Sequence, residues 1–230
     1  MERATEMPGE VLRKPGGSMD TRAKRLLLLY AVLAVPFFLN DFANIYIKDF
    51  ATWIAVDYTF VKALPLAVMF WAVSRGLVGW KEFGLRGLPP LLFIYYGLAM
   101  SVLGVLMDQY GYDFFVLFLP SESLGAIPET PQGNWLGWFD LHVGLFMVGV
   151  MEELVFRGLA FTALFSAGLN SFWTIMLSAL VFGLIHWSLG PAAVAATGAI
   201  GVLFGVCLWR TGSVLPLILA HFVVDYVFFS

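Results

Sequence analysis

Long runs of apolar residues constrain the fold of this chain more than any other feature of its sequence. A membrane-crossing helix needs about 20 apolar residues, and the runs are close to that length. Only 13% of the residues are charged, whereas a typical soluble domain has roughly 25%. We therefore predict an all-α fold, a polytopic transmembrane helical bundle of about seven membrane helices. The runs lie at 26–47, 54–74, 88–107, 139–168, 171–187, 191–210 and 213–230.

The remaining composition narrows the class of protein. The net charge of -3 gives no support to a nucleic-acid partner. A single cysteine, Cys207, excludes an intramolecular disulfide and a thiolate metal cluster. Residues 1–24 mix acids and bases and lack the pattern of a secretory signal. We expect a disordered cytoplasmic tail over 1–24 and a transmembrane helical domain over 25–230, with the chemistry in 148–230.

Basic and acidic residues alternate between the connections that join the runs. Basic residues lie before the first run and between the second and third, and Arg210 follows the sixth. The connections between the first and second runs and between the third and fourth are acidic. By the positive-inside rule, this distribution predicts a cytoplasmic N-terminus and a C-terminus on the opposite side. The connection 108–138 is the only long one, and its prolines and glycine predict an irregular loop, either a lid over a site or a tether.

Charged residues inside the fourth run carry the most information. On insertion scales each charge costs about 2.5–3.5 kcal/mol at the bilayer centre, so Glu152, Glu153 and Arg157 must face the protein interior or a watery cavity. Arg157 follows Glu153 by four residues, which predicts an ion pair on one helix face. Glu152 is turned about 100° from Glu153 on an ideal helix and is left for another partner. A structural clamp between helices is the alternative.

Two later runs carry histidines. Phe182 and His186 are four residues apart, as are His221 and Asp225, so each pair shares a helix face. A lone intramembrane histidine is often an interhelical hydrogen-bonding residue. With a rise of about 1.5 Å per residue, however, both histidines, Glu152 and Asp225 lie at overlapping depths. We therefore expect them to share a cavity.

The sixth run starts after Gly190 and Pro191 and is rich in small residues. Gly201 and Gly205 form a GxxxG spacing, which lets helix backbones approach closely. We expect this run to be a central packing helix with a structural role.

Three motifs, in this order on successive runs, together resemble the CPBP family of CAAX prenyl protease and bacteriocin-processing intramembrane proteases, also called the Abi family. The resemblance covers the chain from Val148 onwards, and the stretch 82–86 resembles the one that leads into the family's helical core. The three motifs are Glu152-Glu153-x-x-x-Arg157, Phe182-x-x-x-His186 and His221-x-x-x-Asp225.

The resemblance implies a role for each matching residue. Glu152 matches the catalytic glutamate that activates a water as general base, and Glu153 and Arg157 match its supporting pair. His186 matches the histidine that holds or polarises this water. His221, with the residue four positions later, matches the group that stabilises the oxyanion of the tetrahedral intermediate. Together these roles imply a glutamic-type hydrolase.

The last motif departs from the family at one position. Many members have Asn where this chain has Asp225. Asn offers N–H donors, whereas an ionised Asp only accepts hydrogen bonds. We expect Asp225 to orient His221 and to support its charged form, and we assign Phe182 a supporting role.

Peptide hydrolysis by these residues needs no cofactor, because they supply a base and oxyanion donors. We favour this metal-free mechanism. A zinc-dependent protease stays open as an alternative, with Glu152, His186 and His221 as the ligands.

We thus expect an intramembrane endopeptidase of a prokaryotic plasma membrane. Its partners would be membrane lipid and a protein or peptide substrate with a membrane-associated tail. A prenylated tail, a bacteriocin leader and a sorting helix all remain open as that tail. A non-catalytic membrane scaffold or immunity protein of the same fold is an alternative function. A transporter would normally show two related halves with interrupted helices, and we detect no internal repeat.

Overall fold

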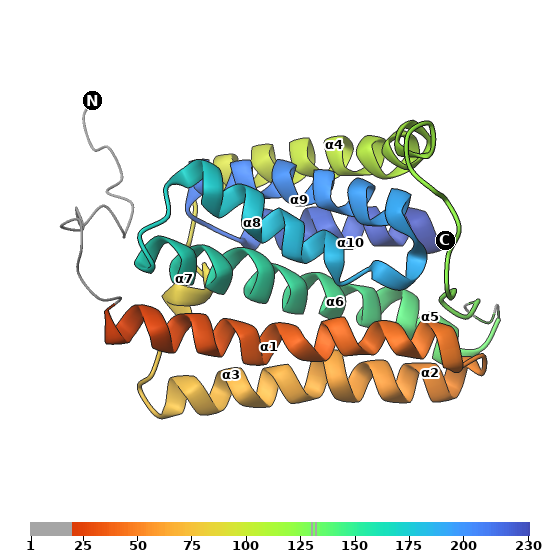
Figure 1. The fold of residues 1–230 in the computed structure, drawn as a ribbon, viewed down its shortest axis with the longest axis horizontal. Coiled ribbons are helices and arrows are strands. Elements are labelled where there is room, and N and C mark those ends of the chain that lie inside the picture. Colours follow the sequence, from red (N-terminus) through yellow and green to blue (C-terminus); the bar gives the residue numbers. More distant parts are fainter. Residues whose placement is uncertain (1–19, 130, 132) are drawn as a thin grey trace.

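All regular structure in the described part of the chain is helical, as predicted. The computed structural model describes residues 20–129, 131 and 133–230 (Figure 1). Seven continuous helical segments run through these residues. They are α1 (Thr21–Tyr46); α2 (Phe50–Asp57), η1 (Tyr58–Ala63) and α3 (Leu64–Ser74); α4 (Pro90–Val116); α5 (Trp135–Phe139), η3 (Asp140–Gly144), α6 (Leu145–Glu152), η4 (Glu153–Leu159) and α7 (Ala160–Ser166); α8 (Ser171–Leu184); α9 (Pro191–Thr211); and α10 (Leu215–Phe229). Two short 3₁₀ turns, η2 (Trp80–Phe83) and η5 (Trp187–Leu189), lie in the connections.

Four of the helices are long and apolar enough to cross a membrane, namely Thr21–Tyr46, Phe50–Ser74, Pro90–Val116 and Pro191–Thr211. Large apolar side chains cover the outer faces of this bundle; Leu28, Phe70 and Tyr95, for example, are more than half exposed. Soluble proteins rarely expose such extended apolar surface. These features indicate an integral membrane protein.

Two helix ends differ from the expected ones. The predicted tail lies outside the described residues up to residue 19, and α1 already begins at Thr21, inside the range assigned to the tail. α4 continues to Val116, nine residues beyond the predicted end of the run at 107. The reason is that an acidic residue such as Asp108 interrupts an apolar run without breaking a helix. Pro120 is the first residue after it that cannot continue an α-helix.

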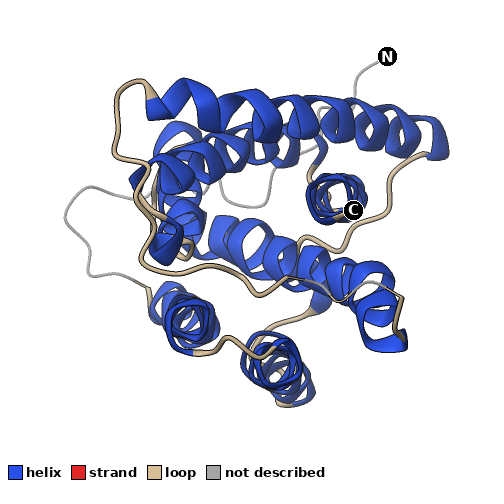
Figure 2. Cartoon of the chain, turned by 90° about the vertical axis from the view of Figure 1, so that its right-hand side faces the viewer, coloured by secondary structure: helices blue, strands red, loops and turns tan. Residues whose placement is uncertain are grey.

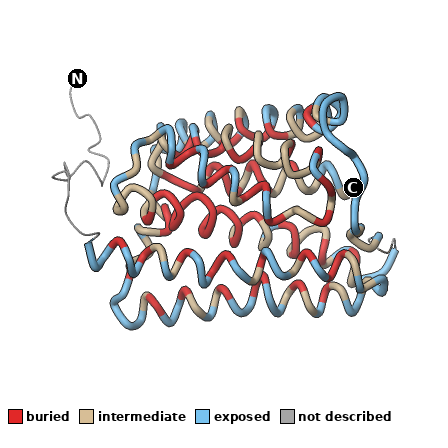
Figure 3. The backbone as a smooth tube through the Cα atoms, in the orientation of Figure 1, coloured by how far each residue is buried: buried red, intermediate tan, exposed pale blue. Residues whose placement is uncertain are grey.

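The segment from α5 to α7 lies in the centre of the bundle. α1 packs along one side of it, and α8 and α10 pack along the other (Figures 1 and 2). Every residue from 151 to 160 is buried, which Figure 3 shows as a continuous red stretch. The first motif therefore lies where no lipid contact is expected.

α9 has the packing role that its small residues predict. It lies between α4 and α8 (Figure 1). A Cβ atom on Gly201 would lie only 3.0 Å from Ala179 of α8, and one on Gly183 would lie 2.5 Å from the Val194 carbonyl oxygen. The glycines thus allow α8 and α9 to come into backbone contact.

The loop after α4 is attached to the end of the bundle at several points. The backbone N–H groups of Leu124 and Gly125 donate to the Ser188 carbonyl at 2.7 and 3.2 Å. Ala126 N–H donates to the Asn44 carbonyl at 3.1 Å, and Ala192 N–H donates to the Pro120 carbonyl at 3.2 Å. We call residues 117–129 the strap, because they cross from α4 over the 186–190 turn to the end of α1.

Candidate active site

The buried pair of the first motif forms as the four-residue spacing predicts. Arg157 Nη1 lies 3.3 Å from Glu153 Oε1, and both side chains are fully buried. The guanidinium carbon of Arg157 lies 3.6 Å from the ring centroid of Phe182 and 5.6 Å from that of Phe204. A cation over an aromatic face is attracted by the ring quadrupole. Phe182 therefore supports the first motif directly.

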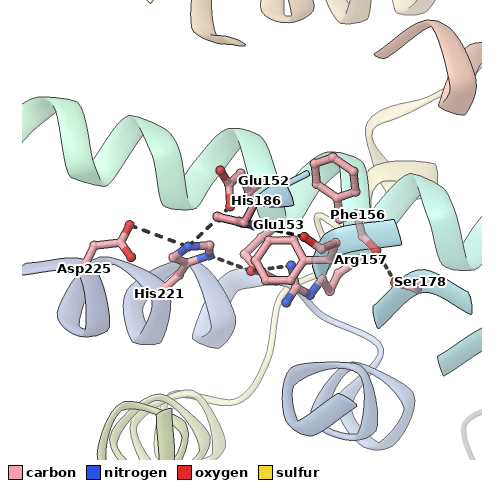
Figure 4. Close-up of polar contacts among 9 residues, drawn as sticks. Glu152, Glu153, Phe156, Arg157, Ser178, His186, His221 and Asp225 are labelled. Atoms are coloured by element: carbon pink, nitrogen blue, oxygen red, sulfur yellow. Dashed lines mark hydrogen bonds and ion pairs between the residues drawn. The ribbon is translucent and has the colours of Figure 1, made fainter. Parts of the chain in front are cut away.

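His221 lies between three carboxyl groups (Figure 4). Its Nδ1 donates a hydrogen bond to Glu153 Oε1 at 2.8 Å. Its Nε2 lies 3.6 Å from Glu152 Oε2 and 3.6 Å from Asp225 Oδ2. The latter two distances are too long for hydrogen bonds, so these contacts are electrostatic. Three carboxyl oxygens thus lie within 3.6 Å of the two ring nitrogens.

Glu153 makes a contact with His221 that the spacing of the motifs does not predict. Spacing connects Glu153 with Arg157 and Asp225 with His221. In the structure, Glu153 makes the short hydrogen bond to His221, and Asp225 faces the opposite ring nitrogen. Because Glu153 Oε1 contacts both Arg157 and His221, one oxygen connects two of the three motifs. No sequence signal could have revealed this contact, since it joins residues 68 positions apart.

Glu152 has a buried carboxyl group whose hydrogen-bonding capacity the protein does not use. Its side chain is 11% exposed, and its Oε2 has no hydrogen-bond partner among the described residues. Buried polar atoms in folded proteins are almost always hydrogen-bonded, so an exception marks a candidate functional group. The neighbouring Asp225 is 19% exposed and lies on the more open side of the cluster.

His186 stands just beyond the end of α8. Its Nδ1 lies 3.1 Å from the Phe182 carbonyl oxygen, which can only accept, so Nδ1 carries the hydrogen and Nε2 is the acceptor in the neutral ring. Its ring packs edge-on against Phe182, whose ring also meets that of His221 at 6.0 Å. The structure thus brings five of the predicted residues into direct contact and joins His186 to them through Phe182. The five are Glu152, Glu153, Arg157, His221 and Asp225.

A glycine brings the first and third motifs together. A Cβ atom on Gly149 of α6 would lie 3.3 Å from the Ile218 carbonyl oxygen and 3.4 Å from His221 Cβ. These distances are tighter than most Cβ contacts in proteins. The missing side chain therefore lets α10 approach α6 closely enough for His221 to reach both glutamates.

The stretch 82–86 packs against the other end of the first motif. A Cβ atom on Gly158 would overlap the Phe83 carbonyl group. The Thr162 hydroxyl donates to the Glu82 carbonyl at 2.8 Å. The stretch that the family resemblance singled out therefore contacts the backbone of η4, the helix that carries most of the first motif and that we call the motif helix. The role of this stretch is structural.

The zinc alternative finds no ligand set in this geometry. Within residues 20–129, 131 and 133–230, no group of three or more His, Cys, Asp or Glu side chains is arranged to hold a metal ion. Glu152 and His221 lie 3.6 Å apart, whereas His186 joins them only through the Phe182 ring.

Fold and site together define a class, that of helical membrane proteins with a buried Glu-Glu-Arg-His-Asp cluster. Residues 134–227 match the family model described as Type II CAAX prenyl endopeptidase Rce1-like. The match spans all three motifs and confirms the predicted resemblance to the CPBP family. At family level this supports a CAAX-type intramembrane protease, a hydrolase with a protein or peptide substrate. Searches of curated proteins and of solved structures gave no match.

Proposed function

We propose that this protein is an intramembrane endopeptidase that hydrolyses a peptide bond in a membrane-associated protein or peptide tail, using a water activated by Glu152. The observation that carries the proposal is the buried Glu152 carboxyl group. It faces a histidine at 3.6 Å, yet it has an oxygen without a hydrogen-bond partner among the described residues. Such a group is poised to take a proton from a bound molecule.

In the proposed reaction, Glu152 takes a proton from water as the water oxygen bonds to the carbonyl carbon of the scissile peptide. The carbonyl electron pair moves to oxygen and gives a tetrahedral oxyanion. The proton on Glu152 then passes to the amide nitrogen, and the C–N bond breaks. The products are a new carboxyl terminus and a free amine.

The neighbouring residues assist these steps. In its charged form, His221 donates one N–H to Glu153 and keeps the Nε2–H for the oxyanion. Asp225 and Glu152, both 3.6 Å from Nε2, stabilise that charge. His186 offers its Nε2 as an acceptor for the second hydrogen of the water. Arg157 forms an ion pair with Glu153 and so holds its carboxyl group in place beside His221.

The test is cleavage of membrane-anchored peptides in proteoliposomes, followed by mass spectrometry. Three tails serve as probes: a C-terminal peptide with a prenylated cysteine, the same peptide without the lipid, and a peptide anchored by one apolar helix. Glu152→Gln is compared with wild type and with Glu122→Gln, the same change on the exposed strap. We expect Glu152→Gln to lower the rate by about 10²-fold or more and Glu122→Gln to leave it unchanged.

Equal cleavage by wild type and Glu152→Gln would remove this residue from the mechanism. No cleavage of any tail by wild type would favour the non-catalytic scaffold instead. The same assay with a zinc chelator separates the two protease mechanisms. Activity that survives the chelator supports the glutamate-activated water. Activity that is lost and then restored by zinc would make Glu152, His186 and His221 metal ligands.

A further inference from the structure

The backbone of His186 lies in a turn just beyond the end of α8. α8 ends at Leu184. Beyond it, His186 N–H donates to the Gly183 carbonyl at 3.0 Å, and the His186 carbonyl accepts from Leu189 N–H at 3.1 Å. His186 itself has φ -102° and ψ 26°, outside the helical region, and the 3₁₀ turn η5 follows at once. Whatever holds this turn therefore fixes the backbone from which the imidazole reaches the Phe182 carbonyl.

Two polar residues of α1 hold the turn. The carboxylate of Asp41 accepts a hydrogen bond from the Ser188 backbone N–H through one oxygen. Its other oxygen accepts from Asn44 Nδ2 at 2.8 Å, and the same amide nitrogen donates to the Ser188 hydroxyl at 3.1 Å. All three residues are buried. We call Asp41, Asn44 and Ser188 the α1 brace.

Neighbouring segments hold the brace itself in place. Trp53 Nε1 of α2 donates to Asn44 Oδ1 at 3.0 Å. On the other side, the strap donates to the Ser188 carbonyl through Leu124 N–H and to the Asn44 carbonyl through Ala126 N–H. The brace thus has further hydrogen-bond partners on α2 and on the strap. Each of its three side chains is hydrogen-bonded.

Packing alone does not require such a network between α1 and the turn. Replacement of both partners of a buried hydrogen bond by apolar groups of the same shape can be nearly neutral for stability. A directional network, in contrast, holds a functional side chain within a fraction of an ångström of its working geometry. Asp41 and Asn44 lie 145 and 142 positions before His186 in the chain, and they meet the turn only two residues after this histidine.

We propose that Asp41 and Asn44 are positioning residues that fix the His186 imidazole through Ser188. This proposal rests on the proposed function, in which His186 holds the attacking water. In this arrangement α1, although outside the matched segment 134–227, contributes to the site.

The hydrogen-bond pattern of the brace provides a rescue test. Both Asp41 oxygens accept hydrogen bonds, one from Asn44 Nδ2 and one from Ser188 N–H. Asp41→Asn replaces one of these oxygens with an NH₂ group, which then faces another donor. Asn44→Asp places two carboxylates side by side. The exchange of both, Asp41→Asn with Asn44→Asp, restores the pattern: the new amide donates to the new carboxylate, and the Ser188 hydroxyl reverses to donate. Trp53 keeps its acceptor in all variants.

The first measurement does not depend on activity. The chain has 3 histidines, so ring-¹⁵N labelling gives a spectrum that can be assigned with His142→Gln, His186→Gln and His221→Gln. We expect Asp41→Asn to shift or broaden the His186 signals, the double exchange to restore them, and His221 to stay unchanged. Asp113→Asn, the same change at an exposed position of α4, should alter nothing. Unchanged His186 signals in Asp41→Asn would overturn the proposal.

The second measurement tests the consequence for the reaction. Asp41→Asn should lower kcat about tenfold or more with little change in KM, and the double exchange should recover most of the loss. In a His186→Ala background, the same substitution should change kcat less than twofold, because the residue it positions is gone. An equal loss in both backgrounds would show a general structural effect and contradict the proposal. If wild type cleaves nothing, the proposed function fails, while the spectra still decide the placement of His186.

Discussion

At the scale of single residues, Glu153 connects the parts of the site. Its Oε1 lies 3.3 Å from Arg157 Nη1 and 2.8 Å from His221 Nδ1, and the side chain is fully buried. The guanidinium lies against the face of Phe182. Lysine could supply the charge here but not the planar stacking, so the two cations are not interchangeable at this position.

This geometry makes Arg157 essential for the stability of the motif helix. Arg157→Met would break this buried ion pair and leave Glu153 with His221 as its remaining partner. Breaking a buried pair costs about 3–5 kcal/mol in other proteins. We expect a loss of this size in the free energy of unfolding, measured by denaturant titration in detergent. Arg210→Met, at an exposed position of α9, is the matched control and should cost little.

The double variant Glu153→Gln with Arg157→Met sharpens this test. It removes both charges, and the glutamine oxygen can still accept from His221. We expect it to be more stable than Arg157→Met alone. A single variant as stable as wild type would show that the ion pair does not hold the helix.

At the scale of elements, the segment from α2 to α3 is attached to the bundle by a second buried polar cluster. Lys62 pairs with Asp57, and both side chains are buried. Asn40 of α1 also donates to Asp57 at 3.1 Å, and the Tyr58 hydroxyl donates to Asp140 at 3.0 Å. These contacts lie at and beside the π-helical turns η1 and η3, and such turns are often found near functional sites.

The Tyr58 hydroxyl is the simplest probe of this attachment. Tyr58→Phe leaves a buried Asp140 oxygen without its donor, which costs about 1–3 kcal/mol. Tyr46→Phe makes the same chemical change at a residue that is 77% exposed, and it should have no measurable effect. Thermal unfolding in detergent measures both. Equal melting temperatures for the two variants would contradict the role of the cluster.

The close contact between η2 and the motif helix predicts that Gly158 cannot be enlarged without loss of stability. Gly158→Ala would push a methyl group into the Phe83 carbonyl group, and overpacking of this kind typically costs about 1–3 kcal/mol. Gly87→Ala, where nothing lies within 4 Å of the new Cβ, is the control. We expect lower thermal stability and slower peptide cleavage for Gly158→Ala only. If both variants match wild type, the close contact is not essential.

Local spacing predicts much of this architecture, and long-range contacts account for what it misses. Apolar runs predict the helices, and the four-residue spacing of Glu153 and Arg157 predicts their ion pair. In contrast, the bond from Asn44 to Ser188 joins residues 144 positions apart, which no spacing rule reaches. The angles expected around Glu152 also assumed an ideal α-helix, whereas Glu153–Leu159 is π-helical, with wider turns.

At the scale of the whole molecule, the basic connections gather at one end of the bundle. Arg22 at the start of α1 pairs with Glu82 at 3.1 Å, and the Ser213 hydroxyl donates to the Arg86 carbonyl at 2.6 Å. α10 ends at the opposite end (Figure 1). By the positive-inside rule, we expect the basic end to lie in the cytoplasm.

This orientation can be tested by cysteine labelling in intact cells. Cys207→Ala removes the native thiol, and single cysteines are then introduced as Lys81→Cys and Ser230→Cys, both at exposed positions. A membrane-impermeant maleimide should label Ser230→Cys directly and Lys81→Cys only after the membrane is opened. The reverse pattern would invert the predicted topology.

The role of Glu152 is tested most directly by cleavage of a membrane-anchored peptide in H₂¹⁸O. We predict that wild type incorporates one ¹⁸O atom into the new carboxyl terminus. Glu152→Gln should bind the same peptide with similar affinity but form labelled product more slowly, by about 10²-fold or more. Labelled product from Glu152→Gln at the wild-type rate would contradict a water activated by this glutamate.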